Sequence, residues 1–173
     1  MPRLFFAIPI PIEQKQKLLA SFPQKNLSGI RFTPLENLHI TAHFLGATSE
    51  EKIPAIIQHA KGISGSISSF GLKFDTFKTI YQKQKPVMIW AQFEENSLFE
   101  NLCLQLRAAF PTDENRKPNP HATLARIKQM KKLPFDLPVI NSFSIVADQV
   151  QLFESHTLAE GSQYEIIDTW NFK

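Results

Sequence analysis

Two short stretches of the chain follow the same pattern, and this repeat constrains the fold more than any other feature. They are residues 38–46 (LHITAHFLG) and residues 120–126 (PHATLAR). Each carries a histidine and, two residues later, a threonine, within an apolar run bounded by Pro, Asn or Gly. Side chains at i and i+2 of a β-strand leave by the same face, so each stretch would present an imidazole beside a hydroxyl. The two units lie about half the chain apart and indicate a diffuse internal repeat.

The segments around the first unit carry strand and helix signals in turn. An apolar run closed by prolines predicts a strand over residues 3–10, and helical spacing of apolar residues predicts a helix over 12–22. Partly alternating residues predict two antiparallel strands over 70–80 and 87–93, joined by a turn at 83–86.

Two further helices are predicted from capping signals. Thr48 and Glu51 have the spacing of a capping box, and Ser97 and Glu100 repeat that spacing ahead of an apolar stripe that ends before Pro111. A proline past the first turn of a helix is unfavourable, so Pro54 favours a later start for the first of these helices.

After the second unit the pattern returns to strands. We expect a loop over residues 128–138, then strands over 143–153 and 164–172 with a turn at 160–162. The order of strand, helix and further strands is thus stated twice, which is typical of an α+β fold with a diffuse internal repeat.

The composition limits the classes of protein that fit. With 173 residues, 43% hydrophobic and 20% charged, the chain is long enough for a substantial core of one domain. No apolar run approaches the roughly 18 residues of a membrane helix, and residues 1–11 do not read as a signal peptide, so a cytoplasmic location is the default expectation. Cys103 is the single cysteine, which excludes an intrachain disulfide and a thiolate metal cluster. The formal charge of +3 suits a polyanionic partner without requiring one.

The two units together resemble the signature of the two-histidine (2H) phosphoesterases. More narrowly, the chain resembles the RNA 2′,3′-cyclic phosphodiesterases, also called 2′-5′ RNA ligase-like proteins. The likeness includes residues 3–7, the lead-in at 34–39, and 152–155 with Gly161 and Tyr164. It implies a single domain over residues 1–173, made of two intertwined, pseudo-symmetric lobes. Each lobe would hold an antiparallel sheet flanked by helices, with an active cleft between them.

The chemistry can also be argued from the residue types. Opening a cyclic phosphate needs a base that deprotonates water and an acid that protonates the leaving ribose oxygen, on opposite sides of phosphorus. His39 and His121 could fill these roles, while the hydroxyls of Thr41 and Thr123 would hold the non-bridging oxygens. The resemblance implies that His121 is the proton acceptor and His39 the proton donor, giving a 2′-phosphate; the residues alone leave the order open. We expect an EDTA-resistant activity with a bell-shaped pH profile around neutrality.

No metal or other cofactor is expected. His39 and His43 lie four residues apart, but Ile40 stands where a zinc helix of the H-E-x-x-H type has its glutamate. His43 shares the predicted strand face of His39 and is expected at an edge or on the surface. Arg126 matches the family's arginine and could add charge at the phosphate. Strict alternation turns it away from His121, so it reaches the site only if the strand bends.

Other residues receive structural interpretations. Alternation turns Phe44 into the core, although it could instead stack on a base, as could Phe32. Cys103 is expected to be a buried thiol, and His59 and His156 are expected to be surface groups. Basic side chains flank the two units, where they could hold a nucleic-acid backbone or simply be solvated: Arg31, Lys83, Lys85, Arg116, Lys117, Lys128, Lys131 and Lys132.

The expected partner is therefore RNA or an oligonucleotide with a cyclic phosphate end, with no membrane and no obligate protein partner, and the protein is expected to be a monomer. Reversible 2′-5′ RNA ligation in the same cleft is a further expectation of the resemblance. Two alternatives stay open from the sequence. One is a non-catalytic nucleotide- or RNA-binding module, and the other is a phosphodiesterase for a different small cyclic or 2′-5′-linked nucleotide.

Overall fold

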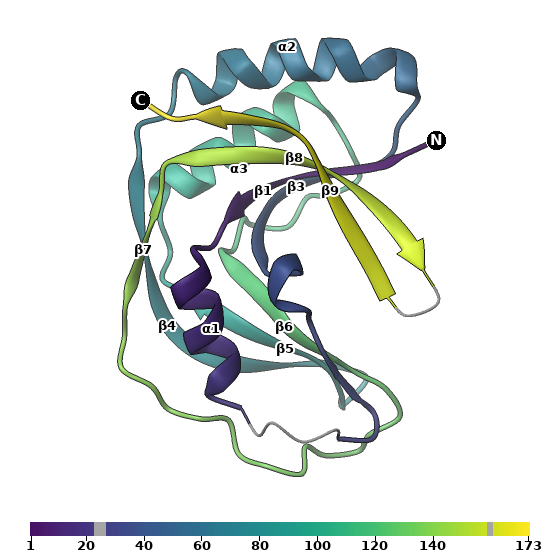
Figure 1. Ribbon diagram of the computed structural model, residues 1–173, viewed down its shortest axis with the longest axis vertical. Helices are drawn as coiled ribbons and strands as arrows, with labels where there is room; N and C mark the ends of the chain where they lie inside the picture. The colour runs from purple at the N-terminus through teal and green to yellow at the C-terminus, as the bar shows by residue number, and fades with distance from the viewer. Residues whose placement is uncertain (23–26, 159–160) are drawn as a thin grey trace.

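The computed structural model describes residues 1–22, 27–158 and 161–173, and shows two antiparallel sheets with helices packed outside them (Figure 1). One sheet has four strands in the order β3-β1-β8-β9, and the other has five in the order β2-β6-β5-β4-β7. The predicted α+β fold with two antiparallel lobes is confirmed. The two histidine–threonine units begin β3 and β6, one in each sheet.

The strands of the four-stranded sheet are β1 (Arg3–Pro9), β3 (His39–Ala47), β8 (Gln149–Leu158) and β9 (Gly161–Asn171). Those of the five-stranded sheet are β2 (Ile30–Phe32), β4 (Phe70–Gln82), β5 (Lys85–Phe93), β6 (His121–Ile127) and β7 (Ser144–Ala147). The helices are α1 (Ile12–Ala20), α2 (Ile53–Ser64) and α3 (Ser97–Ala109), with 3-10 turns η1 (Leu35–Asn37) and η2 (Glu50–Lys52). Helices α2 and α3 pack against each other, α2 also contacting β9 and α3 contacting β3.

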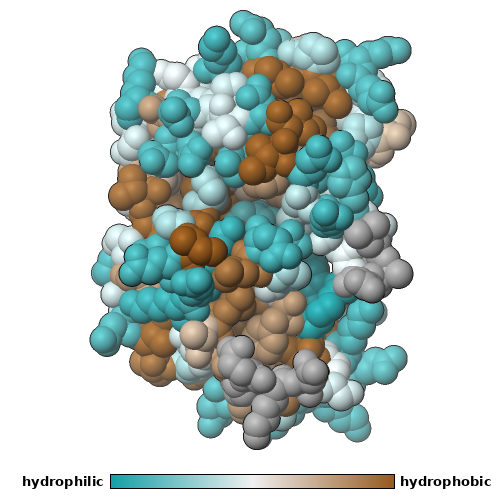
Figure 2. All heavy atoms as spheres, viewed as in Figure 1, coloured by the Kyte–Doolittle hydropathy of each residue, from teal (hydrophilic) through white to brown (hydrophobic). Residues whose placement is uncertain are grey.

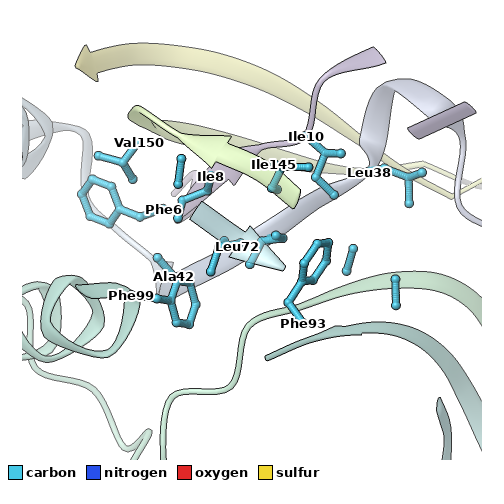
Figure 3. Close-up of a cluster of buried hydrophobic side chains, with 14 of the residues drawn as sticks. Phe6, Ile8, Ile10, Leu38, Ala42, Leu72, Phe93, Phe99, Ile145 and Val150 are labelled. Atoms are coloured by element: carbon cyan, nitrogen blue, oxygen red, sulfur yellow. The ribbon is translucent and has the colours of Figure 1, made fainter. Parts of the chain in front are cut away.

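A single cluster of buried apolar side chains joins both sheets and the helices. Figure 3 shows part of it, with Phe6 and Ile8 from β1, Leu72 from β4, Phe93 from β5 and Phe99 from α3 gathered together. All five side chains are at most 2% exposed. Full burial of a Phe, Leu or Ile side chain stabilises a fold by roughly 1.5–3 kcal/mol. Both lobes, and therefore both histidine units, are anchored in the same core.

Helix α2 corrects the first capping prediction. The Thr48 hydroxyl donates a hydrogen bond to the Gly46 carbonyl (3.1 Å), so it does not cap the helix. The turn η2 intervenes and α2 begins at Ile53, with Pro54 in its first turn, where a missing N–H costs nothing. The later start favoured by Pro54 is confirmed, and the Thr48 capping box is wrong.

Helix α3 begins where expected but is capped by a different residue. The Asn96 side chain accepts hydrogen bonds from the backbone N–H groups of Leu98 (2.9 Å) and Phe99 (3.0 Å). Ser97 is the first helical residue instead of the cap. Asparagine is as good an N-cap as serine. The cap therefore lies one residue before the predicted position.

One predicted strand is two strands in two sheets. Residues 143–153 divide into β7, which pairs with β4, and β8, which pairs with β1. Asp148 lies between them, and its carbonyl accepts from the Phe172 N–H (2.7 Å). The chain thus crosses from one lobe to the other at this residue, which the apolar alternation on both sides concealed. The turn predicted at 83–86 is present but shorter: only Lys83 and Gln84, at positive φ (48° and 63°), lie between β4 and β5, and residues 85 and 86 belong to β5.

The face of the molecule in Figure 2 carries hydrophobic side chains in separate patches among hydrophilic ones. Among the described residues, no helix is long and apolar enough to cross a membrane.

Candidate active site

His39 is held by hydrogen bonds at both ring nitrogens. Nδ1 lies 2.7 Å from the Asn37 carbonyl oxygen and Nε2 lies 3.0 Å from the Thr41 hydroxyl. A carbonyl oxygen only accepts, so Nδ1 carries the proton and Nε2 accepts from the hydroxyl. The ring is therefore fixed as the tautomer whose basic nitrogen lies beside Thr41.

His121 repeats this arrangement in the other lobe. Its Nδ1–H donates to the Asn119 carbonyl (2.8 Å), which again stands two residues earlier. Asn37 and Asn119 thus belong to the repeated unit, in which an Asn precedes each histidine by two positions. The predicted site omitted them, although their equal offset in the sequence was a usable signal. Both rings leave Nε2 as the nitrogen available for proton transfer.

A β-bulge at the same position disrupts both strands. In β3, Thr41 pairs with Ala7 and His43 with Phe6, so Ala42 is an extra residue. In β6, Thr123 pairs with Trp90 and Ala125 with Ile89, so Leu124 is the extra residue. The exposure pattern of the first six residues is identical in the two strands: after the threonine, two consecutive side chains are buried and the next is exposed. A bulge of this kind reverses the alternation of side chains beyond it.

Because the alternation is reversed, two of the predicted side-chain positions are wrong, and the condition stated for Arg126 is met. Phe44 is 57% exposed and lines a cavity together with His121 and Thr123, so its expected core position is wrong. His43 is 2% exposed, so its expected edge or surface position is wrong as well. Arg126 is exposed and lines the same cleft as His121 and Thr123, because the bend that it required is present. Phe44 and Arg126 occupy equivalent places, five residues after each histidine.

His43 has a structural partner on the core side. Its Nε2–H donates to the Phe110 carbonyl (2.7 Å), just beyond α3, and burial lowers its pKa. The imidazole therefore remains neutral at physiological pH and ties β3 to the end of α3.

Aromatic rings surround His39. The ring centroids of Phe5, Tyr164 and Phe153 lie 4.9, 5.3 and 5.9 Å from that of the imidazole. Burial lowers the pKa of His39 to about 4, partly offset by the hydrogen bond to Asn37. The nearby charges of Lys15 and, facing it from the other lobe, His121 lower this pKa further. His39 is therefore neutral near pH 7.

His121 has a different neighbour. Its ring stacks on the indole of Trp90 in β5, with centroids 3.6 Å apart and planes 20° apart. Burial lowers the pKa of His121, again with an opposing hydrogen bond, here to Asn119. Trp90 was not among the predicted site residues, because nothing in the sequence pairs it with a histidine 31 positions later.

Two cavities open on this region. The first, of about 390 Å³, is lined by four of the predicted site residues, namely Thr41, His121, Thr123 and Arg126. His39 is not among the residues that line either cavity, but its Nε2 lies 3.0 Å from the hydroxyl of Thr41, which lines the first. The second, of about 610 Å³, lies between β2, η1, β8 and β9, and Arg126 lines it too. The structure therefore brings all five predicted site residues together.

The first cavity also contains buried polar atoms. Nδ1 of His43, Nε1 of Trp90 and Nε of Arg107 have no hydrogen-bond partner within the described part of the chain, and all three residues line this cavity. Buried polar groups normally bond to protein, water or ligand.

The predicted basic residues are only partly placed at the cavities. Arg116 and Lys117 line the first cavity but pair with Glu114 (2.5 Å) and Glu95 (2.7 Å), and the hydrogen bond from Arg116 lowers the pKa of Glu114 to about 2. Arg31 lines the second cavity. The five remaining predicted lysines are not among the residues that line either cavity: Lys83, Lys85, Lys128, Lys131 and Lys132.

The remaining histidines and the cysteine lie as expected. Cys103 is 1% exposed and burial raises its pKa to about 12, so it is an inert thiol. His59 is exposed on α2, and the His156 side chain is 41% exposed on β8.

Several known proteins are similar to this chain in sequence. Residues 8–90 match the family of LigT-like phosphoesterases. The RNA 2′,3′-cyclic phosphodiesterase of Methanocaldococcus jannaschii is 29% identical over 97% of this chain and 99% of its own length. Over residues 8–90 the chain is thus similar to the LigT-like phosphoesterases. The RNA 2′,3′-cyclic phosphodiesterase of Thermotoga maritima is 26% identical to this chain, over 99% of it and 96% of the relative.

Solved structures share the fold over the whole length. Escherichia coli LigT in complex with 3′-AMP superposes with a TM-score of 0.79 at 25% identity, covering 100% of this chain and 99% of that one. A protein of Thermus thermophilus gives a TM-score of 0.83 at 24% identity, covering 98% of this chain and 97% of that one. The fold of this chain is thus similar to that of both solved structures.

Proposed function

We propose that this protein hydrolyses the 2′,3′-cyclic phosphate ends of RNA to 2′-phosphomonoesters, without a metal ion. The observation that carries the proposal is the matched pair of neutral histidines on β3 and β6, each with Nε2 available and a threonine hydroxyl two residues away. The curated relatives from Methanocaldococcus jannaschii and Thermotoga maritima bear the name of this activity. The cytoplasm and a monomeric state remain our expectations for where and how it acts.

The proposed reaction uses one histidine from each lobe. His121 Nε2 takes a proton from water as the water oxygen attacks phosphorus, and the bond from phosphorus to the ribose 3′-oxygen breaks in line with the attack. His39 gives its proton to that leaving 3′-oxygen. The phosphate stays on the 2′-oxygen, so the product is a 2′-phosphomonoester. Proton exchange with solvent then returns both rings to their starting protonation states.

Three side chains would hold the charge that develops on the phosphate. The hydroxyls of Thr41 and Thr123 donate to the non-bridging oxygens, and the Arg126 guanidinium adds a positive charge beside them. Thr41 would exchange its bond to His39 for one to the substrate. This exchange frees Nε2 of His39 to take up a proton.

The proposed acid has to be protonated, although burial keeps His39 neutral near pH 7. A bound cyclic phosphate carries a negative charge, and an opposite charge within about 4–6 Å favours the charged form of a histidine. Substrate binding would therefore raise the pKa of His39 and charge the acid only when it is needed.

Product analysis tests the reaction. An oligoribonucleotide ending in a 2′,3′-cyclic phosphate is incubated with the protein and EDTA, and the phosphomonoester is identified. A 2′-phosphate is expected. Strict dependence on a divalent ion would contradict the proposed chemistry, and binding without turnover would favour the nucleotide- or RNA-binding module. Turnover confined to another small cyclic or 2′-5′-linked nucleotide would move the assignment to that substrate.

The order of the two histidines needs a separate test. A nucleoside phosphodiester with p-nitrophenol as its leaving group needs no acid, since p-nitrophenolate departs unprotonated. We expect this substrate to restore much of the rate of His39→Ala and little of the rate of His121→Ala. The opposite result would exchange the proposed roles.

The same residues would serve ligation if the 5′-hydroxyl of a second RNA replaced water as the nucleophile. The bond to the 3′-oxygen would again break, and the product would be a 2′-5′ phosphodiester. Incubating the cyclic-phosphate end with excess 5′-hydroxyl RNA, and testing the joined product for resistance to 3′-5′-specific ribonuclease, would detect it.

A further inference from the structure

The two cavities differ in which residues of the proposed reaction line them. The first cavity holds His121 and both threonines, and its volume of about 390 Å³ is in the range of small-ligand sites. The second cavity is larger, at about 610 Å³, and holds neither of the catalytic histidines. Arg126 lines both, so the two cavities meet at the proposed phosphate-binding residue.

The second cavity has the chemistry of a nucleotide site. Phe32 and Tyr164 supply aromatic rings, and Ile166 adds an apolar side chain that is 52% exposed. Two arginines and a single acid, Glu36, are the charged residues among its described lining. Aromatic platforms with neighbouring cations are how proteins bind single-stranded nucleic acid without reading its sequence.

The covalent structure of the substrate determines which nucleotide would lie in the second cavity. The cyclic phosphate occupies both the 2′- and 3′-oxygens of the terminal ribose, so the rest of the RNA can leave only through the 5′-oxygen. If the reacting phosphate and its own nucleoside fill the first cavity, the preceding nucleotide must lie outside it. The second cavity adjoins the first at Arg126, where the connecting phosphodiester would pass beside a guanidinium group.

We propose that the second cavity binds the nucleotide preceding the reacting end, so that the enzyme selects RNA ends of two or more nucleotides over cyclic mononucleotides. This inference rests on the proposed function, since it assumes that a cyclic phosphate reacts in the first cavity. It assigns Ile166 and Phe32 to substrate selection and gives them no part in the chemical step.

The test compares a nucleoside 2′,3′-cyclic phosphate with a dinucleotide that ends in the same group. The unmodified protein should have a kcat/KM about tenfold higher for the dinucleotide, as expected for one added stacking contact. Ile166→Glu places a negative charge where the preceding nucleotide would lie. It should remove that advantage, so that kcat/KM for the dinucleotide falls about tenfold and that for the mononucleotide falls much less.

Val146→Glu is the matched control. Val146 is also an exposed aliphatic residue on a strand, 64% exposed on β7, and it lines neither cavity. It should leave both substrates unaffected. Glu36→Gln makes the opposite change to Ile166→Glu, removing the acid from the second cavity, and should raise kcat/KM for the dinucleotide by about twofold to threefold. Equal rates on the two substrates, or an Ile166→Glu loss that is the same for both, would overturn the inference.

Binding separates this inference from the proposed function. Absence of turnover on either substrate would contradict the proposed function. The proposed role of the second cavity would then be tested by comparing the affinities of the protein for a nucleoside 3′-phosphate and for a dinucleotide 3′-phosphate. Tighter binding of the dinucleotide, abolished by Ile166→Glu and kept by Val146→Glu, supports the second cavity as a nucleotide site, and equal affinities overturn it.

Discussion

The two halves of the site share a backbone and differ in their surroundings. His39 and His121 make the same hydrogen bond to an Asn carbonyl two residues earlier, and both strands bulge three residues after the histidine. Yet three aromatic rings surround His39, whereas His121 stacks on a single indole beside the first cavity. The motif fixes the tautomer and the direction of each ring. Its neighbours decide how readily each ring takes up a proton.

The same contrast holds at the residue that each bulge exposes. In one strand that residue is Phe44 and in the other Arg126. One lobe therefore offers the substrate an apolar ring, and the other offers a cation. A pseudo-symmetric frame thus becomes a chemically asymmetric cleft, which suits a substrate with a base at one end and a phosphate at the other.

The largest effect is expected from removing either histidine. His39→Ala and His121→Ala should each lower kcat by about 10²–10⁴-fold, the usual contribution of a general acid or base. Because the two act in one step, the double variant should be little worse than the poorer single variant. Steady-state rates on a cyclic-phosphate oligonucleotide measure this, with His59→Ala as the control. Additive losses would mean that the halves act independently.

Removing a threonine hydroxyl should cost less. Thr41→Ala and Thr123→Ala are each expected to lower kcat by roughly 10- to 1000-fold, as for a lost transition-state donor. Thr→Ser at the same positions keeps the hydroxyl and should retain most activity. A loss with serine as large as with alanine would indicate a packing role for the threonine methyl group instead.

The residues exposed by the bulges should differ in the kinetic constant that they affect. Arg126→Ala removes a charge from the reacting phosphate and should lower kcat/KM by about 10- to 100-fold. Phe44→Ala removes a ring that contacts substrate more remotely and should raise KM by less than about tenfold with kcat nearly unchanged. A larger fall in kcat for Phe44→Ala than for Arg126→Ala would reverse the assignment of the two lobes.

The pH profile should report the environments of the two rings. The base must be neutral and the acid protonated, so activity rises through one pKa and falls through the other. Both pKa values lie below the ordinary 6.5 in the free protein, that of His39 at about 4. The optimum of kcat/KM should therefore lie below pH 6.5, lower than the sequence-based expectation. The optimum of kcat should lie at higher pH, because bound phosphate raises both pKa values. Coincident optima would show that the substrate does not charge the acid.

The smallest effect concerns stability. A histidine whose folded pKa is lowered contributes stability above its unfolded pKa near 6.5, and this stability is lost as the pH falls toward 4. For His39 the loss is on the order of 2 kcal/mol at pH 5. Urea unfolding of the protein and of His39→Gln at pH 7.5 and 5 should show a flatter pH dependence for the variant. His43 contributes in the same direction in both proteins. An equal pH dependence would mean that His39 is hydrated in the folded state.

Much of this site follows from the sequence because a strand has a fixed period of two. Placing His39 beside Thr41 and His121 beside Thr123 required only that rule, and the expectation that the two pairs face each other across a cleft came from the family resemblance. The partners of His39 in the sheet, Phe5, Phe153 and Tyr164, lie in segments that the family resemblance had already marked.

The bulges could not be predicted from local patterns. A bulge depends on how a strand pairs with its neighbours, and Ala42 and Leu124 are apolar residues that fit an unbroken alternation equally well. This one omission explains the errors at His43 and Phe44. The division of β7 from β8 had a weak signal, since the buried positions change from Ile145 and Ala147 to Val150 and Leu152 across Asp148. Only the tertiary fold shows that the break moves the chain to another sheet.

The two sheets also differ in how far apart their paired strands lie in the sequence. Strands β4, β5 and β6 pair with neighbours in sequence order, whereas His39 acquires its surroundings only when β1 and β3 meet β8 and β9, more than a hundred residues downstream. Closing such long loops costs entropy before any contact compensates for it, and slows folding. The His121 half should therefore organise early, and the His39 half should be the last part of the catalytic machinery to assemble as the polypeptide is synthesised.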